Sequence, residues 1–209
     1  MSAHCCTPQP PSQSDPKYRR ILWIALAVNA VMFVIEVFFS WQSQSVSLLA
    51  DSIDFLGDAA NYGISLWVLA MSVRARATAS LFKAASMALF GAGVLIHAIW
   101  NATTGVIPDA QTMSLIGLLA LVANLAIAML LYAYRNGDSN MRSVWLCTRN
   151  DALSNIAVII AAIGVFGTGT AWPDLFVAMV MASLALTGAW QIIKQARQEL
   201  HPHSSKHNH

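Results

Sequence analysis

Residues 48–63 read LLADSIDFLGDAANYG, a segment whose apolar residues predict a helix but which carries Asp51, Asp54 and Asp58. The surrounding chain decides the environment of that helix. Of its 209 residues, 56% are hydrophobic and only 11% are charged, whereas a typical soluble domain is about 25% charged. The composition is that of a membrane protein, so three carboxylates in an apolar segment need a physical reason.

Six apolar runs of about 20 residues, the length with which a helix crosses a bilayer, occupy most of the sequence. They cover roughly 21–40, 47–71, 79–100, 113–134, 144–166 and 174–193. Runs this long exclude β-barrel strands, which alternate in hydrophobicity over about 10 residues. We therefore predict an all-α membrane protein with six transmembrane helices. The expected organisation is a tail over residues 1–20, a six-helix domain over 21–200 and a His-rich tail over 201–209.

Basic residues indicate the orientation of these helices. Eleven of the twelve Lys and Arg residues fall before the first span, around the second and fourth connections, or after the sixth span. Such an excess marks the cytoplasmic side, so both termini are expected in the cytoplasm. The twelfth, Arg149, falls inside the fifth span. Because the basic residues are spread along the membrane edges, a nucleic-acid interface is not expected.

Two pairs of candidate ligands are spaced four residues apart in two of the spans. Asp54 and Asp58 lie in the second span, and Cys147 and Asp151 lie in the fifth, so each pair shares a helix face. Four mixed thiolate and carboxylate donors suit a borderline or soft divalent metal, although Cys147 alone is more typical of a small buried hydrophobe. Without metal, crowded carboxylates hold protons, which metal binding would release. The pattern outlines a metal/proton antiporter.

Three further charged residues within the spans are interpreted as supporting residues. Asp51 shares a face with Asp54 and Asp58. It is expected to hydrogen-bond to another helix, to shape the entrance of the site or to pair with Arg149. Glu36, in the first span, is a second candidate partner of Arg149, unless that cation extends to the cytoplasmic interface.

These segments resemble the cation diffusion facilitator family over almost all six spans. The resemblance lies in NAVMFVIE (29–36), SVSLLADSIDFLGD (45–58), SNMRSVWLCTRNDALSNIAVI (139–159) and WPDLFVAMVMASLAL (172–186). It implies export of a divalent metal from the cytoplasm by proton antiport, usually by a homodimer. It also implies a transport site at Asp54, Asp58, Cys147 and Asp151. The expected cargo is Zn²⁺ or Cd²⁺, with Co²⁺, Ni²⁺, Fe²⁺ and Mn²⁺ left open, and no permanently bound cofactor is expected.

Two departures from the family pattern affect these expectations. The family usually has His where this chain has Cys147, and thiolate favours softer ions. Members also commonly carry a cytoplasmic metal-sensing and dimerising domain, whereas HPHSSKHNH follows Leu200. We therefore expect a short form, with any dimer contacts in the spans, where GAG at 91–93 permits close helix approach. The expected location is the bacterial cytoplasmic membrane.

The two tails offer accessory metal ligands. Such His- and Cys-containing tracts can bind metal, or they are dispensable. They keep open an alternative function, a membrane metal sensor or partner-binding protein that does not transport. An intramembrane metal hydrolase is disfavoured because no general base accompanies the predicted metal site, so the protein is not expected to be an enzyme. The accessory ligands are His4, Cys5, Cys6, His201, His203, His207 and His209.

Overall fold

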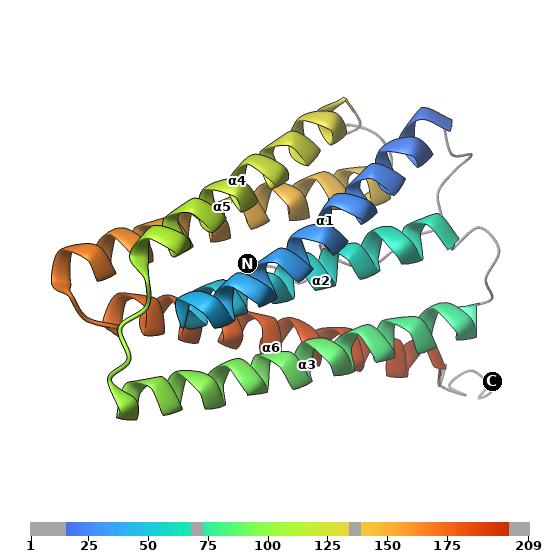
Figure 1. Ribbon diagram of the computed structural model, residues 1–209. Coiled ribbons are helices and arrows are strands. Elements are labelled where there is room, and N and C mark those ends of the chain that lie inside the picture. Colours follow the sequence, from blue (N-terminus) through green and yellow to red (C-terminus); the bar gives the residue numbers. More distant parts are fainter. Residues whose placement is uncertain (1–15, 68–72, 134–138, 201–209) are drawn as a thin grey trace, which may run out of the picture.

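The chain folds into six helices that run alternately in opposite directions through one bundle (Figure 1). The computed structural model describes residues 16–67, 73–133 and 139–200, without the side chains of residues 73–76, 139–147, 149–150, 195 and 198–200. These ranges contain no strand, so the predicted all-α class is confirmed. The helices are α1 (Pro16–Ser43), α2 (Val46–Trp67), α3 (Val73–Thr104), α4 (Ala110–Tyr132), α5 (Ser139–Thr168) and α6 (Trp172–Leu200).

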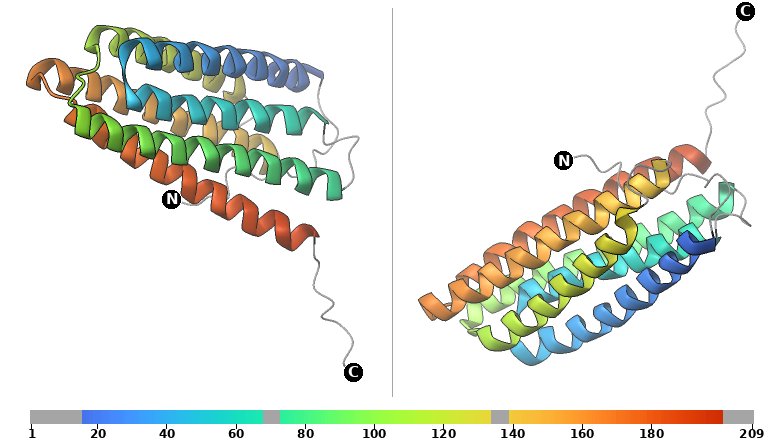
Figure 2. Two further views of the ribbon diagram at one scale, coloured as in Figure 1. Left: turned by 60° about the horizontal axis from the view of Figure 1, so that its bottom comes forward. Right: turned by 90° about the horizontal axis from the view of Figure 1, so that it is seen from above.

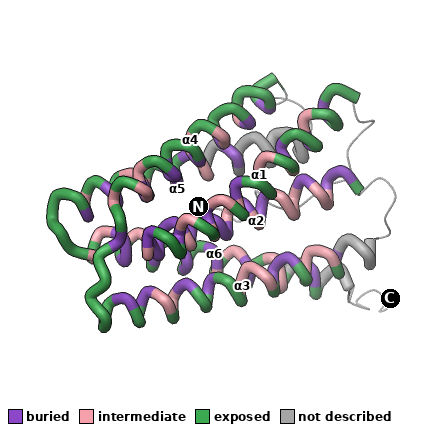
Figure 3. Tube along the Cα trace, in the orientation of Figure 1, coloured by how far each residue is buried: buried purple, intermediate pink, exposed green. Residues whose placement is uncertain are grey.

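The outer surface of the bundle is apolar, as a membrane protein requires. Five helices, all except α2, include a stretch long and apolar enough to cross a membrane. Helix α2 carries three aspartates within 22 residues, yet it packs against α1, α3, α5 and α6 as part of the same bundle. Exposed residues cover the outer faces of the helices (Figure 3), and Phe38, Phe82 and Phe166 are among them. An apolar exterior of this extent fits contact with lipid.

The two ends of the bundle differ in which helices begin and end there (Figures 1 and 2). We call the end where α1 begins and α6 ends the base, and the opposite end the top. Helices α2 and α4 also end at the base, where α3 and α5 begin. The start of α1 and the end of α6 thus lie at the same end of the bundle, as an even number of antiparallel helices requires.

Three helix pairs make the most extensive contacts: α1 with α2, α3 with α6, and α4 with α5. A Cβ atom placed on Gly91 of α3 would lie 3.2 Å from the side chain of Leu186 on α6. A Cβ atom on Gly93 would meet no atom within 4 Å. Of the two glycines in the GAG segment, Gly91 therefore serves a contact within the chain, and only Gly93 lies on an open face.

Helix α6 holds the start of α2 at the top of the bundle through the buried carboxylate of Asp174. The backbone N–H of Val46 donates to Oδ2 at 2.8 Å, and the N–H of Ser47 donates to Oδ1 at 3.1 Å. The hydroxyls of Ser45 and Ser47 also donate to Oδ1, at 2.7 and 2.6 Å. Asp174 therefore caps α2 from another helix and satisfies donors that a helix start leaves open.

Candidate transport site

Several polar side chains of the spans face the interior of the bundle. On α1, the buried positions include Asn29, Glu36, Ser40 and Ser43, which are seven, four and three residues apart and so share one face of the helix. The exposed residues of the same helix include Trp23, Val34 and Phe38. The helix is thus polar on its inner face and apolar on its outer face, which is the arrangement expected around an ion path within a membrane.

Asp58 and Asp151, predicted from the four-residue spacing, are brought together by α2 and α5. Their carboxyl groups lie within hydrogen-bonding range of one another. Asp58 is buried and Asp151 is half-buried. Two ionised carboxylates bring only acceptors to such a contact, so a shared proton or a cation stabilises the pair. A metal ion that displaces this proton would neutralise both groups.

A hydrogen-bonded pair on the base side of Asp58 fixes the register of α2 against α5. The Tyr62 hydroxyl lies 3.3 Å from Oδ2 of Asp58, to which it donates, and 2.7 Å from the Thr148 hydroxyl. Thr148 is fully buried. Cys147 precedes Thr148 by one residue on α5, so the backbone of Cys147 lies at the level of Asp58 and Tyr62, although its side chain lies outside the described residues.

Asp54 lies one turn before Asp58 on α2 and is half-buried. Its charge is close enough to act on Glu36 of α1. In the part of the chain that the structure describes, no three or more His, Cys, Asp and Glu side chains form a group ready to hold a metal ion. The four-ligand site at Asp54, Asp58, Cys147 and Asp151 therefore stays a prediction, with the contact between Asp58 and Asp151 as its described part.

Asp51 takes its hydrogen bond from Asn155, a residue that the sequence reasoning did not single out. The Asn155 amide on α5 donates to Oδ2 of Asp51 at 2.7 Å. Asn124 of α4 donates in turn to Oδ1 of Asn155 at 2.8 Å. The expectation that Asp51 hydrogen-bonds to another helix is thus met. The proposed pairing with Arg149 concerns a side chain outside the described residues.

The side chain of Lys83 reaches from α3 toward the region of Asp58. Sequence reasoning assigned it to the membrane edge, but the side chain is buried, and its ammonium group donates a hydrogen bond to Asn61 of α2. Its charge is close enough to act on Asp58. A buried lysine beside an acidic site balances negative charge when no metal is bound.

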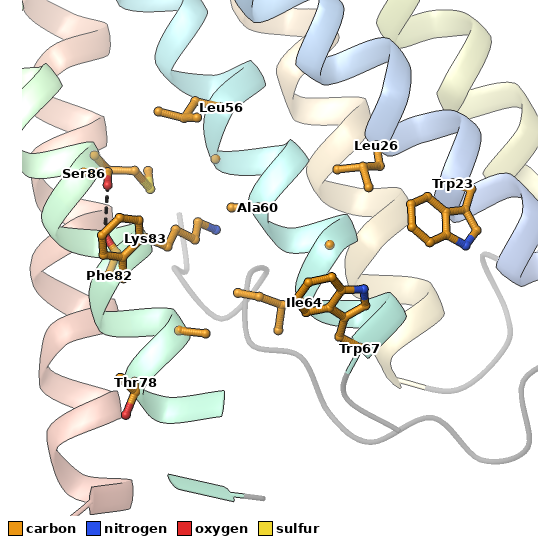
Figure 4. A pocket seen from close by; sticks show the side chains of 14 residues that line it. Trp23, Leu26, Leu56, Ala60, Ile64, Trp67, Thr78, Phe82, Lys83 and Ser86 are labelled. Carbon is orange, nitrogen blue, oxygen red and sulfur yellow. Dashed lines mark hydrogen bonds between the residues drawn. The ribbon is translucent and has the colours of Figure 1, made fainter. Parts of the chain in front are cut away.

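A cavity of about 810 Å³ lies between α1, α2 and α3 in the base half of the bundle (Figure 4). Gly57, next to Asp58 in sequence, lines its inner part, and Trp67 lines it where α2 ends. Figure 4 shows the Lys83 side chain reaching from α3 toward α2 across this space. Among the described residues that line the cavity, only Lys83 is charged. The cavity extends from the base to the residue beside Asp58.

The remaining predicted ligands fall outside the described ranges, so their positions are untested. Two features of the sequence could have identified Asn155 and Lys83 as site residues. Asn155 lies four residues after Asp151, on the same face of α5, and Lys83 lies six residues after Ala77, where an apolar stretch begins. Neither feature identifies the helix that each side chain contacts. The untested tail ligands are His4, Cys5, Cys6, His201, His203, His207 and His209.

Comparison with known proteins gives a match to one family. The family model described as the cation efflux transmembrane domain matches residues 22–201, which include all the predicted membrane ligands.

Individual relatives are similar over most of this chain. The zinc transporter ZitB of Yersinia pseudotuberculosis is 27% identical over 89% of this chain and 64% of its own length. The metal cation efflux system protein CzcD of Cupriavidus metallidurans is 26% identical over 85% of this chain and 60% of its own. A cadmium, cobalt and zinc/H⁺-K⁺ antiporter of Bacillus subtilis is 24% identical over 85% and 62%. The chain thus spans less than two thirds of the length of these relatives.

Proposed function

Because this chain belongs to the cation efflux family, we propose that it exports a divalent transition-metal ion from the bacterial cytoplasm in exchange for protons. The metal ligands are Asp54, Asp58, Cys147 and Asp151. The names of the relatives support Zn²⁺, Cd²⁺ or Co²⁺ as cargo, and one of them names H⁺ and K⁺ as exchanged ions. The two termini lie in the cytoplasm, which places the base of the bundle on the cytoplasmic side.

The contact between Asp58 and Asp151 is the observation that carries this proposal. Two carboxyl groups within hydrogen-bonding range are stabilised by a proton between them or by a cation in its place. Metal binding requires the deprotonated ligands and therefore releases protons. A site that alternates between these two states, and that opens first to one side and then to the other, exchanges metal for protons.

Lys83 gives this exchange a charge balance, and the cavity at the base gives Lys83 room to move. The cavity reaches from the base to Gly57, next to Asp58. The Lys83 ammonium near Asp58 repels an arriving divalent ion, so the side chain has to move away as metal binds. The free volume around Lys83 accommodates that movement.

Vesicles that contain the purified protein test the proposal. With a pH gradient imposed, Asp54→Ala and Asp151→Ala should each abolish uptake of Zn²⁺ and Cd²⁺, because each removes a ligand that has no substitute. Asp109→Ser is the matched control: it removes an aspartate on the exposed loop before α4 and keeps a residue able to cap that helix. Unchanged flux in both Asp54→Ala and Asp151→Ala would refute the assignment.

The same vesicles separate transport from the alternative function. A chain trimmed to residues 16–200 should keep most of its metal flux, because the four predicted ligands all lie within that range. If the trimmed protein loses its function while both aspartate variants keep theirs, the protein is instead a sensor or partner-binding protein that acts through its tails.

A further inference from the structure

Glu36 and Asp51 form a second pair of acids, separate from the predicted metal ligands. Both side chains are buried, at 0% and 1% exposure, and their carboxyl groups lie within hydrogen-bonding range of one another. Two ionised carboxylates cannot make that contact, because neither contributes a proton. Both Glu36 oxygens and Oδ1 of Asp51 lack a hydrogen-bond donor among the described residues. Buried carboxyl oxygens in this state need a cation.

Two asparagines extend this pair into a site with side chains from four helices. Asn155 of α5 donates to Asp51 of α2 at 2.7 Å, and Asn124 of α4 donates to Asn155 at 2.8 Å. Asn124 is 2% exposed, and its Oδ1 also lacks a partner among the described residues. With Glu36 of α1, the cluster leaves three carboxylate oxygens and the Asn124 amide oxygen without a donor among the described residues, and such oxygens are ligands of hard cations. Asn155 holds Asp51 and Asn124 in place.

The charged side chains that the structure describes around the cluster do not neutralise it. Helix α1 packs against α2 and α4. Helix α2 adds the negative charge of Asp54, and the described part of α4 has no charged residue. Helix α5 carries Asp151 one turn before Asn155, and Arg149 lies six residues before Asn155, about 9 Å along the helix axis. The described surroundings are therefore acidic or neutral.

We propose that Glu36, Asp51, Asn124 and Asn155 form a second site for the counter-ion, a small hard monovalent cation, in addition to the proton that metal displaces from Asp58 and Asp151. This inference rests on the transport function proposed above. A hard divalent ion fits the cluster poorly, because it takes six or more oxygens, whereas the cluster leaves four oxygens without a donor among the described residues. A proton needs one carboxyl oxygen, and an alkali cation accepts neutral amide oxygens. The proton and the alkali cation both bind to a carboxyl oxygen that has no hydrogen-bond donor in the described part of the chain, and the experiment distinguishes these two ions.

The test separates movement of the metal from its coupling to a counter-ion. Exchange of labelled for unlabelled Zn²⁺ at equal concentrations across a vesicle membrane needs no counter-ion. The Zn²⁺ gradient at which net flux stops depends on the counter-ion gradient, and each exchanged proton contributes about tenfold per unit of pH difference. Glu36→Gln should leave Zn²⁺ exchange measurable and should lower the limiting Zn²⁺ gradient by about tenfold per pH unit.

Two measurements identify the counter-ion, and a second variant and a control variant test whether the effect is specific to this pair of acids. One measurement imposes a pH gradient at equal K⁺, and the other imposes a K⁺ gradient at equal pH. A weaker dependence on either gradient in Glu36→Gln supports the site and names its ion. Asp51→Asn should weaken the same dependence, and Ser40→Ala on the same inner face of α1 should match wild type in both measurements.

Several outcomes overturn this site. If Glu36→Gln keeps the wild-type dependence on both gradients, the counter-ion binds elsewhere, and the same result is expected if Arg149 already neutralises the pair. Loss of Zn²⁺ exchange in the folded Glu36→Gln protein would assign Glu36 to metal binding instead. These results leave the proposed function standing, whereas a wild-type protein without metal flux would refute the proposed function itself.

Discussion

Replacing Asp174 should loosen the top of the bundle, because one carboxylate there accepts four hydrogen bonds. Asp174→Ala would remove the acceptor for the backbone N–H groups of Val46 and Ser47 and for the hydroxyls of Ser45 and Ser47. The two hydroxyls already lie 3.3 Å apart and can turn toward each other. The two buried N–H groups have no such option, since their position is set by α2.

The magnitude follows from those two N–H groups. A buried donor without a partner costs about 1–3 kcal/mol, so two of them predict a loss of about 2–6 kcal/mol in the free energy of unfolding. Asp109 is the matched control, because its carboxylate also caps a helix by accepting from two backbone N–H groups, those of Gln111 and Thr112. Asp109 caps α4 in an exposed position, where water can replace it, so Asp109→Ala should cost about 1 kcal/mol.

Unfolding of both variants in mixed micelles, followed by tryptophan fluorescence and circular dichroism, measures the difference. Asp174→Asn adds a graded point: it keeps one acceptor but places an amide donor near the start of α2, so its stability should fall between wild type and Asp174→Ala. If Asp174→Ala costs no more than Asp109→Ala, the carboxylate of Asp174 does not hold α2 to α6 in the way that the hydrogen bonds indicate.

Three further perturbations have defined outcomes. A Cβ at Gly164 would lie 2.8 Å from the proline ring in the first turn of α6, whereas one at Gly167 would meet nothing within 4 Å. Thermal unfolding should show Gly164→Ala destabilised by about 1–3 kcal/mol and Gly167→Ala unchanged or more stable by up to about 1 kcal/mol. The pKa of Asp109 lies below its usual 3.8, chiefly because the Thr112 hydroxyl donates to it. Its stabilisation of α4 is therefore complete above pH 3.8 and is lost as the pH falls through the lower folded-state pKa, which hydrogen exchange in the first turn of α4 would detect. Cys147→His should shift transport preference from Cd²⁺ toward Zn²⁺, and an unchanged ranking of metals would make Cys147 a packing residue.

The six helices could be predicted from the sequence because apolar length alone identifies them, but their ends could not. Helix α1 begins at Pro16, before the expected start at 21, and α3 runs from Val73 to Thr104 rather than over 79–100. Helices continue past the apolar core into the interfacial region, where polar residues carry no hydropathy signal. The prediction was therefore correct in the number and order of the helices, five of which are long and apolar enough to span a membrane, and short at several ends.

In the candidate site, positions within one helix could be predicted from the sequence, whereas contacts between helices could not. The spacing of Asp54 and Asp58 follows from helix geometry and needs no partner. The hydrogen bonds from Asn155 to Asp51 and from Lys83 to Asn61 depend on how helices cross and in which register they pack. Asparagine carries no charge to mark it within a span, and a lysine near the end of a span is ordinarily taken to reach the interface.

Asp54 connects the two proposed ion sites, and that connection accounts for exchange rather than independent binding. Its charge acts on Glu36, and it lies one turn from Asp58. A divalent ion bound at Asp54 cancels this negative charge and so weakens the hold of Glu36 on a cation. Linkage is reciprocal, so a cation at Glu36 weakens metal binding by the same factor. Because Asp174 fixes the top of α2 while the cavity borders its base half, movement of α3 and Lys83 at the base can open the metal ligands without separating the two sites. Occupation of one site then favours release from the other, which is the requirement for antiport.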